Sequence, residues 1–183
     1  MRPILVVIVG LVGTGKTTVA KALAERLGLE YISSDETRKR LAGMPETEHR
    51  QEGFDRGIYS PAFTDSVYDV ILDMAGEGLL GGKSVVLDAS FISEERRSWA
   101  KWQAHICGAG FYAVECRCDE KIIKERLSSR RDTPSDGTWD VYLEQKKVFE
   151  PPDEILAERH IVVDTAKPIE RIVNKIVERM ERK

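Results

Sequence analysis

The stretch IVGLVGTGKTTVA, residues 8–20, decides the fold because a glycine-rich turn there joins an apolar run to a helical pattern. Its glycines at 10 and 15, followed by Lys16 and Thr17, fit G-x-x-x-x-G-K-[ST], and Gly13 adds a further glycine. Glycines let backbone N–H groups turn inward around phosphate oxygens, and the N-terminus of the following helix adds positive potential. In such a loop the lysine reaches the outer phosphates and the threonine hydroxyl binds Mg²⁺.

A glycine-rich turn with a solvated lysine is the alternative interpretation of the same residues. The confirming context, an apolar run before the loop and a helical pattern after it, favours phosphate binding. The residues expected to bind the nucleotide in this segment are Gly10, Gly13, Thr14, Gly15, Lys16, Thr17 and Thr18.

Short apolar runs alternate with helical patterns along the rest of the chain. The runs predicted to be strands are residues 4–9, 31–33, 84–88, 111–116 and 160–164. Apolar residues recur at helical spacing in residues 19–27, 63–74, 99–106, 122–127 and 169–180. This alternation predicts a doubly wound α/β fold: a mostly parallel five-stranded sheet with helices on both faces. We expect residues 1–183 to form a single domain.

Composition narrows the function classes. With a net charge of -3, the chain is not expected to bind an extended nucleic acid through its phosphate backbone, since such domains are usually basic. Its three cysteines are too few for a disulfide framework. No stretch approaches the ~20 apolar residues of a membrane span. We therefore expect a cytoplasmic protein, a monomer or weak homodimer, that does not bind membranes and takes a small-molecule or nucleotide-like acceptor.

A carboxylate and an arginine follow the second predicted strand. In YISSDETRKRL, Asp35 and Arg38 are three residues apart, on one helical face. The carboxylate can accept the proton of an attacking hydroxyl, and the arginine can orient an acceptor or stabilise the transferring group. The alternative is structural: Ser33 and Glu36 have capping-box spacing, so Asp35 can be an acidic first-turn residue.

A second carboxylate, Asp88, ends the third predicted strand in VVLDASF. An aspartate at this position beside a phosphate loop binds Mg²⁺, directly or through water, or an acceptor hydroxyl. It can also be a loop residue preceding a helix that begins near Ser93. The expected metal ligands are Thr17, Asp35 and Asp88.

Arginines gather where the fourth predicted helix ends, in KERLSSRRDTPSDGTW. Arg126 and Arg130 share one helical face, Arg131 follows, and the segment 132–137 is rich in turn residues. This pattern predicts a lid, about residues 126–140, that closes over the phosphates. The same cations would also stabilise any helix C-terminus.

Residues 41–60 show no sustained periodicity and are the candidate loop for acceptor specificity. The side chains considered for that role are His49, Arg50, Arg56 and Tyr59. Outside this loop, Trp99 and Trp102 are expected in the core, and His105 and His160 in structural roles.

Nearly the whole chain resembles the P-loop kinases of small acceptors, which include polynucleotide 5′-hydroxyl kinases, zeta toxins, chloramphenicol phosphotransferases and gluconate kinases. The resemblance is carried by GLVGTGKTT, SSDETRKRLAG, GIYSPAFTDSVYDVI, VVLDASF, ECRCDEKIIKERLSSR and VVDTAKP. It implies Asp35 as the base and Arg38 as its partner. It also implies that Arg126 stacks on adenine and Arg130 touches phosphate.

The DTAKP segment resembles the adenine loop of gluconate and nucleotide kinases. That resemblance implicates Thr165, Ala166 and Lys167 in binding the nucleotide. With the loop residues above, the expected catalytic set is Lys16, Asp35, Arg38 and Arg130.

The leading hypothesis is a phosphotransferase that uses ATP and Mg²⁺ to phosphorylate a hydroxyl of a small or nucleotide-like acceptor. A polynucleotide 5′-hydroxyl kinase, a nucleoside monophosphate kinase and a regulatory NTPase switch are the alternatives. The sequence leaves the acceptor and the choice between ATP and GTP open. It also leaves open the oligomeric state, the ligand of Asp88, and which of Arg126, Arg130 and Arg131 act in the lid.

Overall fold

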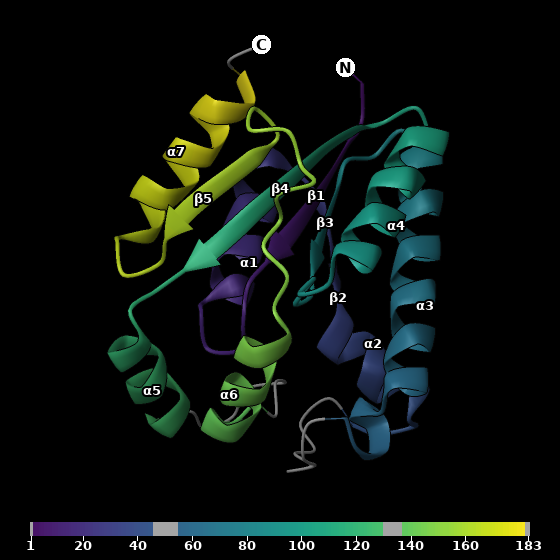
Figure 1. Cartoon of the computed structure of the whole chain (residues 1–183). Coiled ribbons are helices and arrows are strands. Elements are labelled where there is room, and N and C mark those ends of the chain that lie inside the picture. Colours follow the sequence, from purple (N-terminus) through teal and green to yellow (C-terminus); the bar gives the residue numbers. More distant parts are fainter. Residues whose placement is uncertain (1, 46–54, 130–136, 182–183) are drawn as a thin grey trace.

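Five parallel strands form one sheet in the order β2-β3-β1-β4-β5 (Figure 1). In this computed structural model, residues 2–45, 55–129 and 137–181 are described. The strands are β1 (Ile4–Val9), β2 (Glu30–Ser33), β3 (Val85–Asp88), β4 (Gly110–Arg117) and β5 (His160–Asp164). At the centre, Val7 of β1 is paired with Leu87 of β3 and Ala113 of β4. The predicted five-stranded sheet is confirmed, and its strand pairs are all parallel.

Helices cover both faces of the sheet, as expected. The helical segments are α1 (Lys16–Leu27), α2 (Ser34–Leu41), the 3₁₀ turn η1 (Gly57–Tyr59), α3 (Pro61–Leu80), α4 (Glu94–Ile106), α5 (Glu120–Ser129), α6 (Trp139–Val148) and α7 (Ile169–Glu181). α1 and α7 pack together on one face, and α3 and α4 on the other, while α5 and α6 lie beyond the carboxyl ends of the strands (Figure 1). This is a doubly wound α/β architecture.

The sheet is buried from both sides because its strands are almost wholly apolar. Leu5 and Val7 of β1 point into the cluster beneath α3 and α4, and Val6 and Ile8 point into the cluster beneath α1 and α7. All four are fully buried. Successive side chains of β1 therefore pack into the two cores in turn. Because both faces of the strand are buried, it lacks the polar residues of a half-exposed strand.

Side-chain caps begin two of the helices that follow strands. Ser33 accepts a hydrogen bond from the backbone N–H of Glu36, and Ser93 accepts one from that of Arg96. Each cap satisfies an N–H group that the first turn of a helix leaves without an internal partner. Local sequence thus determines where α2, which carries Asp35, and α4, which follows Asp88, begin.

All five strands end at the same edge of the sheet, which is the lower edge in Figure 1. In parallel sheets of this type, ligands bind outside the carboxyl ends of the strands. Among the helices of the described residues, none has both the length and the apolar character needed to cross a membrane.

Two expectations about side-chain burial are wrong. Trp99 is 36% exposed and Trp102 is 62% exposed on α4, although helical spacing predicted both in the core. The buried face of α4 is instead formed by Arg97, Ala100 and Ala104. Small residues there let the helix lie close to the sheet and leave the tryptophans on the opposite side.

Candidate active site

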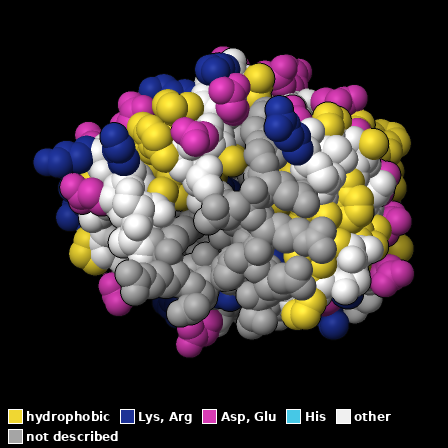
Figure 2. All heavy atoms as spheres, turned by 90° about the horizontal axis from the view of Figure 1, so that it is seen from below, with side chains coloured by type: hydrophobic (Ala, Val, Ile, Leu, Met, Phe, Trp, Pro, Cys, Tyr) yellow, Lys and Arg dark blue, Asp and Glu magenta, His cyan; other side chains and the backbone are white. Residues whose placement is uncertain are grey.

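A cleft of about 520 Å³ opens at the carboxyl edge of the sheet. Its walls come from the glycine-rich loop, the start of α2, the η1–α3 segment, the β3–α4 loop and one side of α6. Figure 2 views the molecule from this side, and its coloured atoms show basic, acidic and hydrophobic side chains mixed around the outline. Mixed charge of this kind suits a compact ligand better than a long polyanion.

The glycine-rich loop has the conformation that its sequence predicts. Gly13 has φ +81°, and a Cβ there would lie 2.8 Å from Cγ2 of Ile123. Gly10 has φ +148°, and a Cβ there would lie 2.8 Å from the backbone oxygen of Cys116. A larger residue at either position would combine backbone strain with a clash.

Lys16 and Thr17 open α1 and line the cleft. The Lys16 ammonium donates a 2.9 Å hydrogen bond to the Leu11 backbone oxygen, within the loop. The Thr14 hydroxyl donates to the same oxygen at 2.7 Å. The ammonium is therefore held over the turn whose N–H groups and helix terminus favour an anion.

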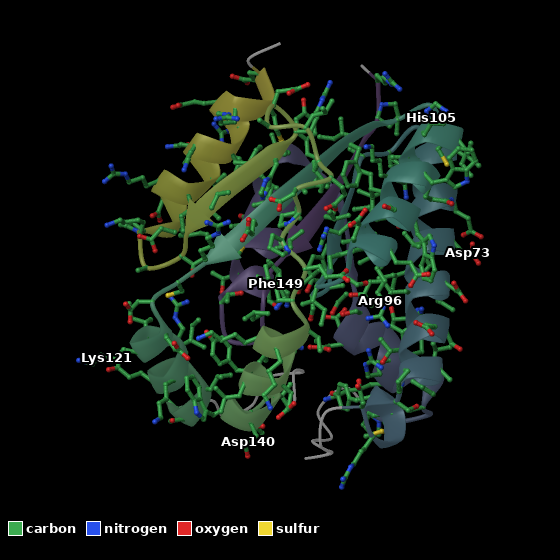
Figure 3. All side chains as sticks on the ribbon, in the orientation of Figure 1. Asp73, Arg96, His105, Lys121, Asp140 and Phe149 are labelled. Atoms are coloured by element: carbon green, nitrogen blue, oxygen red, sulfur yellow. The ribbon has the colours of Figure 1, made fainter. Side chains whose placement is uncertain are left out.

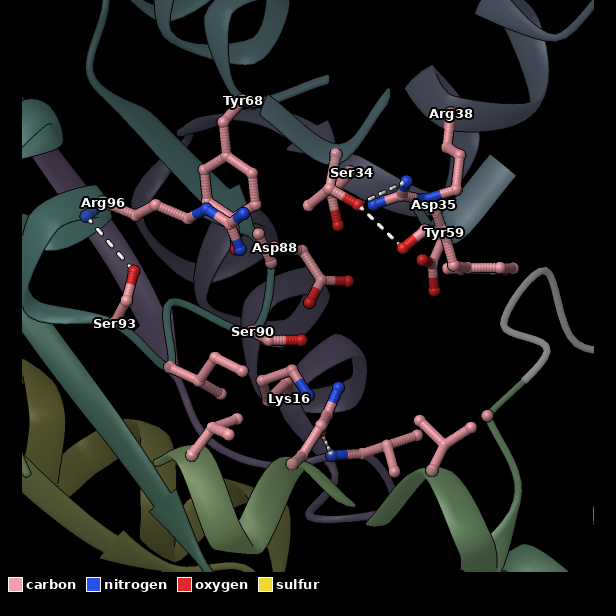
Figure 4. Close-up of a pocket in the computed structure, with 18 of the residues that line it drawn as sticks. Lys16, Ser34, Asp35, Arg38, Tyr59, Tyr68, Asp88, Ser90, Ser93 and Arg96 are labelled. Carbon is pink, nitrogen blue, oxygen red and sulfur yellow. Dashed lines mark hydrogen bonds between the residues drawn. The ribbon is translucent and has the colours of Figure 1, made fainter. Parts of the chain in front are cut away.

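Asp35 projects into the cleft from the first turn of α2, on the side facing Lys16 (Figure 4). Asp88 enters from the end of β3, and its Oδ2 accepts a 2.8 Å hydrogen bond from the Tyr31 hydroxyl. Burial, together with the Asp88 charge, raises the Tyr31 pKa. Tyr31 thus remains a hydrogen-bond donor and orients the Asp88 carboxylate.

The donor set in the cleft fits Mg²⁺. Thr17 contributes a hydroxyl, and Asp35 and Asp88 contribute carboxylates on the same cleft. Within the described chain no three His, Cys, Asp or Glu side chains are grouped as a metal cage. Mg²⁺ is commonly held by one or two carboxylates together with water and substrate phosphates, and the carboxylates of Asp35 and Asp88 line this cleft.

Arg38 occupies a more buried position than its neighbour Asp35. Its side chain is 5% exposed, donates to the Ile58 backbone oxygen and, at 3.1 Å, to the Thr64 hydroxyl, and lies 4.7 Å from the Tyr59 ring centre. Burial lowers its pKa, and the Asp35 charge opposes that shift. Its Nε has no hydrogen-bond partner among the described residues.

Arg126 and Thr165 meet beside the glycine-rich loop. Arg126 donates to the Thr165 hydroxyl at 3.0 Å and to its backbone oxygen at 2.7 Å. The Thr165 hydroxyl donates at 2.7 Å to the backbone oxygen of Thr14. A Cβ at Gly15 would lie 3.3 Å from Nη1 of Arg126. The structure therefore brings together three segments that the sequence assigned to the nucleotide.

The other two residues of that predicted loop point elsewhere. Lys167 lies 3.8 Å from the Asp164 carboxylate, and the Ala166 N–H donates to Asp164 at 2.9 Å. Both are exposed. Arg56, from the candidate acceptor loop, is exposed and does not line the cleft, whereas Tyr59 does. The candidates Arg130, Arg131, His49 and Arg50 lie outside the described residues.

Sequence reasoning missed Arg96 and its partner Tyr68. Both line the cleft, with the guanidinium 4.6 Å from the ring centre (Figure 4). Arg96 also pairs with Asp65 at 2.9 Å. The Ser93 cap was a usable signal, because it places Arg96 in the first turn after β3. Tyr68 gave no such signal, since it looks like an ordinary apolar position of α3.

α6 was also missed, and it forms part of the cleft wall. The Gln145 side-chain oxygen accepts a 2.8 Å hydrogen bond from the Val12 N–H, which joins α6 to the glycine-rich loop. Only Tyr142 of this helix is buried. A short, polar helix with one buried residue gives little periodicity to detect.

Comparison with known proteins agrees with this architecture. The AAA_33 family model, described as an AAA domain, matches residues 5–152. An uncharacterised protein of Mycobacterium tuberculosis is 30% identical over 129 residues, which cover 70% of this chain and 26% of that protein. The chain thus spans about a quarter of the length of that relative. A shikimate kinase of Bacillus cereus (strain AH187) is 26% identical over 179 residues, covering 94% of this chain and 96% of the relative.

Solved structures with the same fold include a sugar kinase from Janibacter, with a TM-score of 0.70 at 17% identity. That likeness covers 99% of this chain and 95% of the other. A gluconokinase from Sinorhizobium meliloti has a TM-score of 0.67 at 24% identity, covering 99% and 93%. The resemblance stated from the motifs is confirmed: the chain belongs to the AAA_33 family of AAA domains, and its fold is that of P-loop kinases of small molecules.

Proposed function

We propose that this chain transfers the γ-phosphoryl group of ATP, with Mg²⁺, to a hydroxyl of a small-molecule or nucleotide-like acceptor. The observation that carries the proposal is the placement of Lys16, Thr17 and Asp35 on one cleft. The first two belong to a phosphate-binding loop, and the third is a carboxylate across from it (Figure 4). The shikimate kinase relative and the fold shared with a sugar kinase support an acceptor that bears hydroxyls.

The loop side of the cleft would bind the nucleotide. Lys16 would contact the outer phosphates, and backbone N–H groups at the start of α1 would surround them. Arg126 and Thr165, beside Gly15, would form the wall for the base. When bound through Thr17 and Asp88, Mg²⁺ would offset the negative charge of the phosphates.

The opposite side would bind the acceptor. Asp35 would accept the proton of the acceptor hydroxyl as its oxygen bonds to the γ-phosphorus and the bond from that phosphorus to ADP breaks. Arg38, held by Ile58 and Thr64, would fix the position of the acceptor or of the transferring group. Its burial and its stacking on Tyr59 limit the motion of the guanidinium.

An acceptor screen tests the reaction class. ADP release would be followed with ATP and Mg²⁺ against sugars, polyols, hydroxy acids, nucleosides, antibiotics, short oligonucleotides and nucleoside monophosphates. We expect ADP release to be negligible without an acceptor and to rise at least tenfold with one hydroxyl compound. Stimulation confined to a nucleoside monophosphate, or to a 5′-hydroxyl oligonucleotide, would instead identify the corresponding alternative. Steady ADP release that no acceptor changes would favour a regulatory NTPase and contradict the proposal.

A further inference from the structure

An exposed apolar stripe runs along α4 outside the cleft, and Glu95, one turn before the stripe, lines the edge of the cleft. Trp99, Trp102 and Ile106 are 36%, 62% and 55% exposed. They are spaced three and four residues apart, so they share one face of the helix. That face lies opposite Ala100 and Ala104, which pack on the sheet. Burying large apolar side chains of this kind is the usual driving force of protein association.

The stripe is self-complementary. With exposed Glu95 it forms the series 95, 99, 102, 106, whose spacings of four, three and four residues are the same from either end. Two such helices packed antiparallel about a twofold axis between positions 99 and 102 would bring each Trp99 against Trp102 of the second copy. Glu95 would then lie beside Ile106. An interface in which the same patch meets itself is the type found in twofold dimers.

Charge also favours the antiparallel arrangement. Glu94 and Glu95 lie at the start of α4, where the Glu150 carboxylate accepts from the Glu94 N–H. At its other end, Arg2 donates to the Gly108 backbone oxygen. A shallow hollow of about 240 Å³ at that end is lined by the basic side chains Arg2, Lys101, His105 and Arg159. Figure 3 shows His105 and Arg96 toward opposite ends of the helix. Arg96 and Arg97, which follow the two glutamates, are paired with Asp65 and Glu154. Antiparallel packing would therefore set Glu94 and Glu95 of one copy toward the basic end of α4 in the other.

We propose that this stripe is a homodimer interface, in which α4 packs antiparallel against α4 of a second copy. An aromatic side chain buries about 150–250 Å² when fully covered. The exposed parts of four tryptophans and two isoleucines therefore supply several hundred Å², below the roughly 1,200–2,000 Å² of stable complexes. A dissociation constant in the micromolar range is expected. This inference does not depend on the proposed reaction.

Sedimentation velocity on the full chain, from 1 to 200 µM, tests the association. We expect a concentration-dependent dimer for the unchanged protein, and at least a tenfold weaker one for Trp102→Glu and for Ile106→Glu. Leu27→Glu is the matched control, because Leu27 is 37% exposed on α1, across the sheet. Circular dichroism would verify that each variant is folded. A monomer at every concentration, or a dimer that only Leu27→Glu weakens, would overturn the proposal.

Disulfide trapping tests the orientation. Glu95→Cys and Ile106→Cys would each be made in a Cys107→Ser background and oxidised separately and as a mixture. Antiparallel packing predicts a cross-linked dimer only in the mixture, because like positions would lie about 16 Å apart along the axis. A disulfide requires Cα atoms within about 7 Å. Cross-links within each separate variant, or none in the mixture, would contradict the antiparallel dimer.

Discussion

Arg126 on α5 and Thr165 after β5 are joined by two hydrogen bonds, 3.0 Å to the hydroxyl and 2.7 Å to the backbone oxygen. Because the Thr165 hydroxyl also donates to the Thr14 backbone oxygen, the two side chains connect the glycine-rich loop to two other segments. Residues that lie 39 positions apart in sequence thus form one wall of the proposed nucleotide site.

Removal of that wall should weaken nucleotide binding. For Arg126→Ala we expect the dissociation constant for ATP with Mg²⁺ to rise about tenfold, which corresponds to roughly 1.4 kcal/mol. The charge and the stacking surface of the guanidinium are both lost in this variant. Isothermal titration calorimetry would measure the change, with exposed Arg171→Ala on α7 as the control. Equal affinities for the two variants would remove Arg126 from the site.

Asp35→Asn should separate catalysis from binding. We expect kcat for the acceptor reaction to fall by about 10²–10⁴, the usual contribution of a general base. The dissociation constant for ATP should stay within about twofold, since the amide keeps the shape of the side chain. Asp73→Asn, on the exposed face of α3, is the control and should retain full activity (Figure 3). Turnover that survives in Asp35→Asn would show that another group accepts the proton.

Gly13→Ala should destabilise the fold more than Gly108→Ala does. Both glycines have positive φ, +81° and +65°, so both substitutions strain the backbone. Only at Gly13 would the added Cβ also meet side chains, those of Ile123 at 2.8 Å and Leu127 at 3.0 Å. We expect Gly13→Ala to reduce the free energy of unfolding by about 1–3 kcal/mol more than Gly108→Ala. Urea unfolding would measure the stability of both variants. Equal losses of stability would mean that α5 can move away from the glycine-rich loop without a measurable cost.

Low pH should destabilise the fold by disrupting the ion pair of Arg97 and Glu154. Arg97 is 1% exposed, and its Nε lies 2.5 Å from the Glu154 carboxylate. Although burial acts in the opposite direction, the hydrogen bonds and charge of Arg97 lower the Glu154 pKa below its ordinary value of 4.5. A carboxylate whose pKa is lower in the folded state stabilises the fold above the unfolded pKa. That stability is lost as pH falls through the folded value.

The measurement is urea unfolding of Glu154→Gln and the unchanged protein between pH 7 and pH 3. At pH 7 the variant should be less stable, by about 3–5 kcal/mol if the Arg97 charge is left unpaired. The difference in free energy of unfolding should narrow below pH 4.5, because protonation of Glu154 then breaks the ion pair in the unchanged protein as well. Exposed Glu158→Gln should follow the unchanged protein. A constant gap at all pH values would contradict this account.

Local signals in the sequence were sufficient for the fold. The apolar runs predicted each strand to within two residues at either end, because buried parallel strands must be apolar on both faces. The serines at 33 and 93 marked the helix starts after β2 and β3. Where a helix turned one small-residue face to the sheet, as α4 does with Ala100 and Ala104, periodicity alone assigned the wrong side.

The site was predictable only where residues follow a strand or form a contiguous motif. Lys16, Asp35 and Asp88 satisfy that condition and line one cleft. Gln145 and Tyr68 do not, because each reaches the cleft from a helix whose position depends on tertiary packing. Tyr59 was a candidate of the acceptor loop and lines the cleft, but its contact with Arg38 was not predicted, since the η1 turn positions it rather than any repeating pattern.

Nucleotide binding by the glycine-rich loop is the central claim, and titration calorimetry with purified protein, Mg²⁺ and ATP or GTP tests it most directly. We expect one site per chain with a micromolar dissociation constant, weakened at least tenfold in Lys16→Met. No detectable heat with either nucleotide, confirmed by an unchanged unfolding temperature, would contradict the account. Equal affinity in the unchanged protein and in Lys16→Met would contradict it as well.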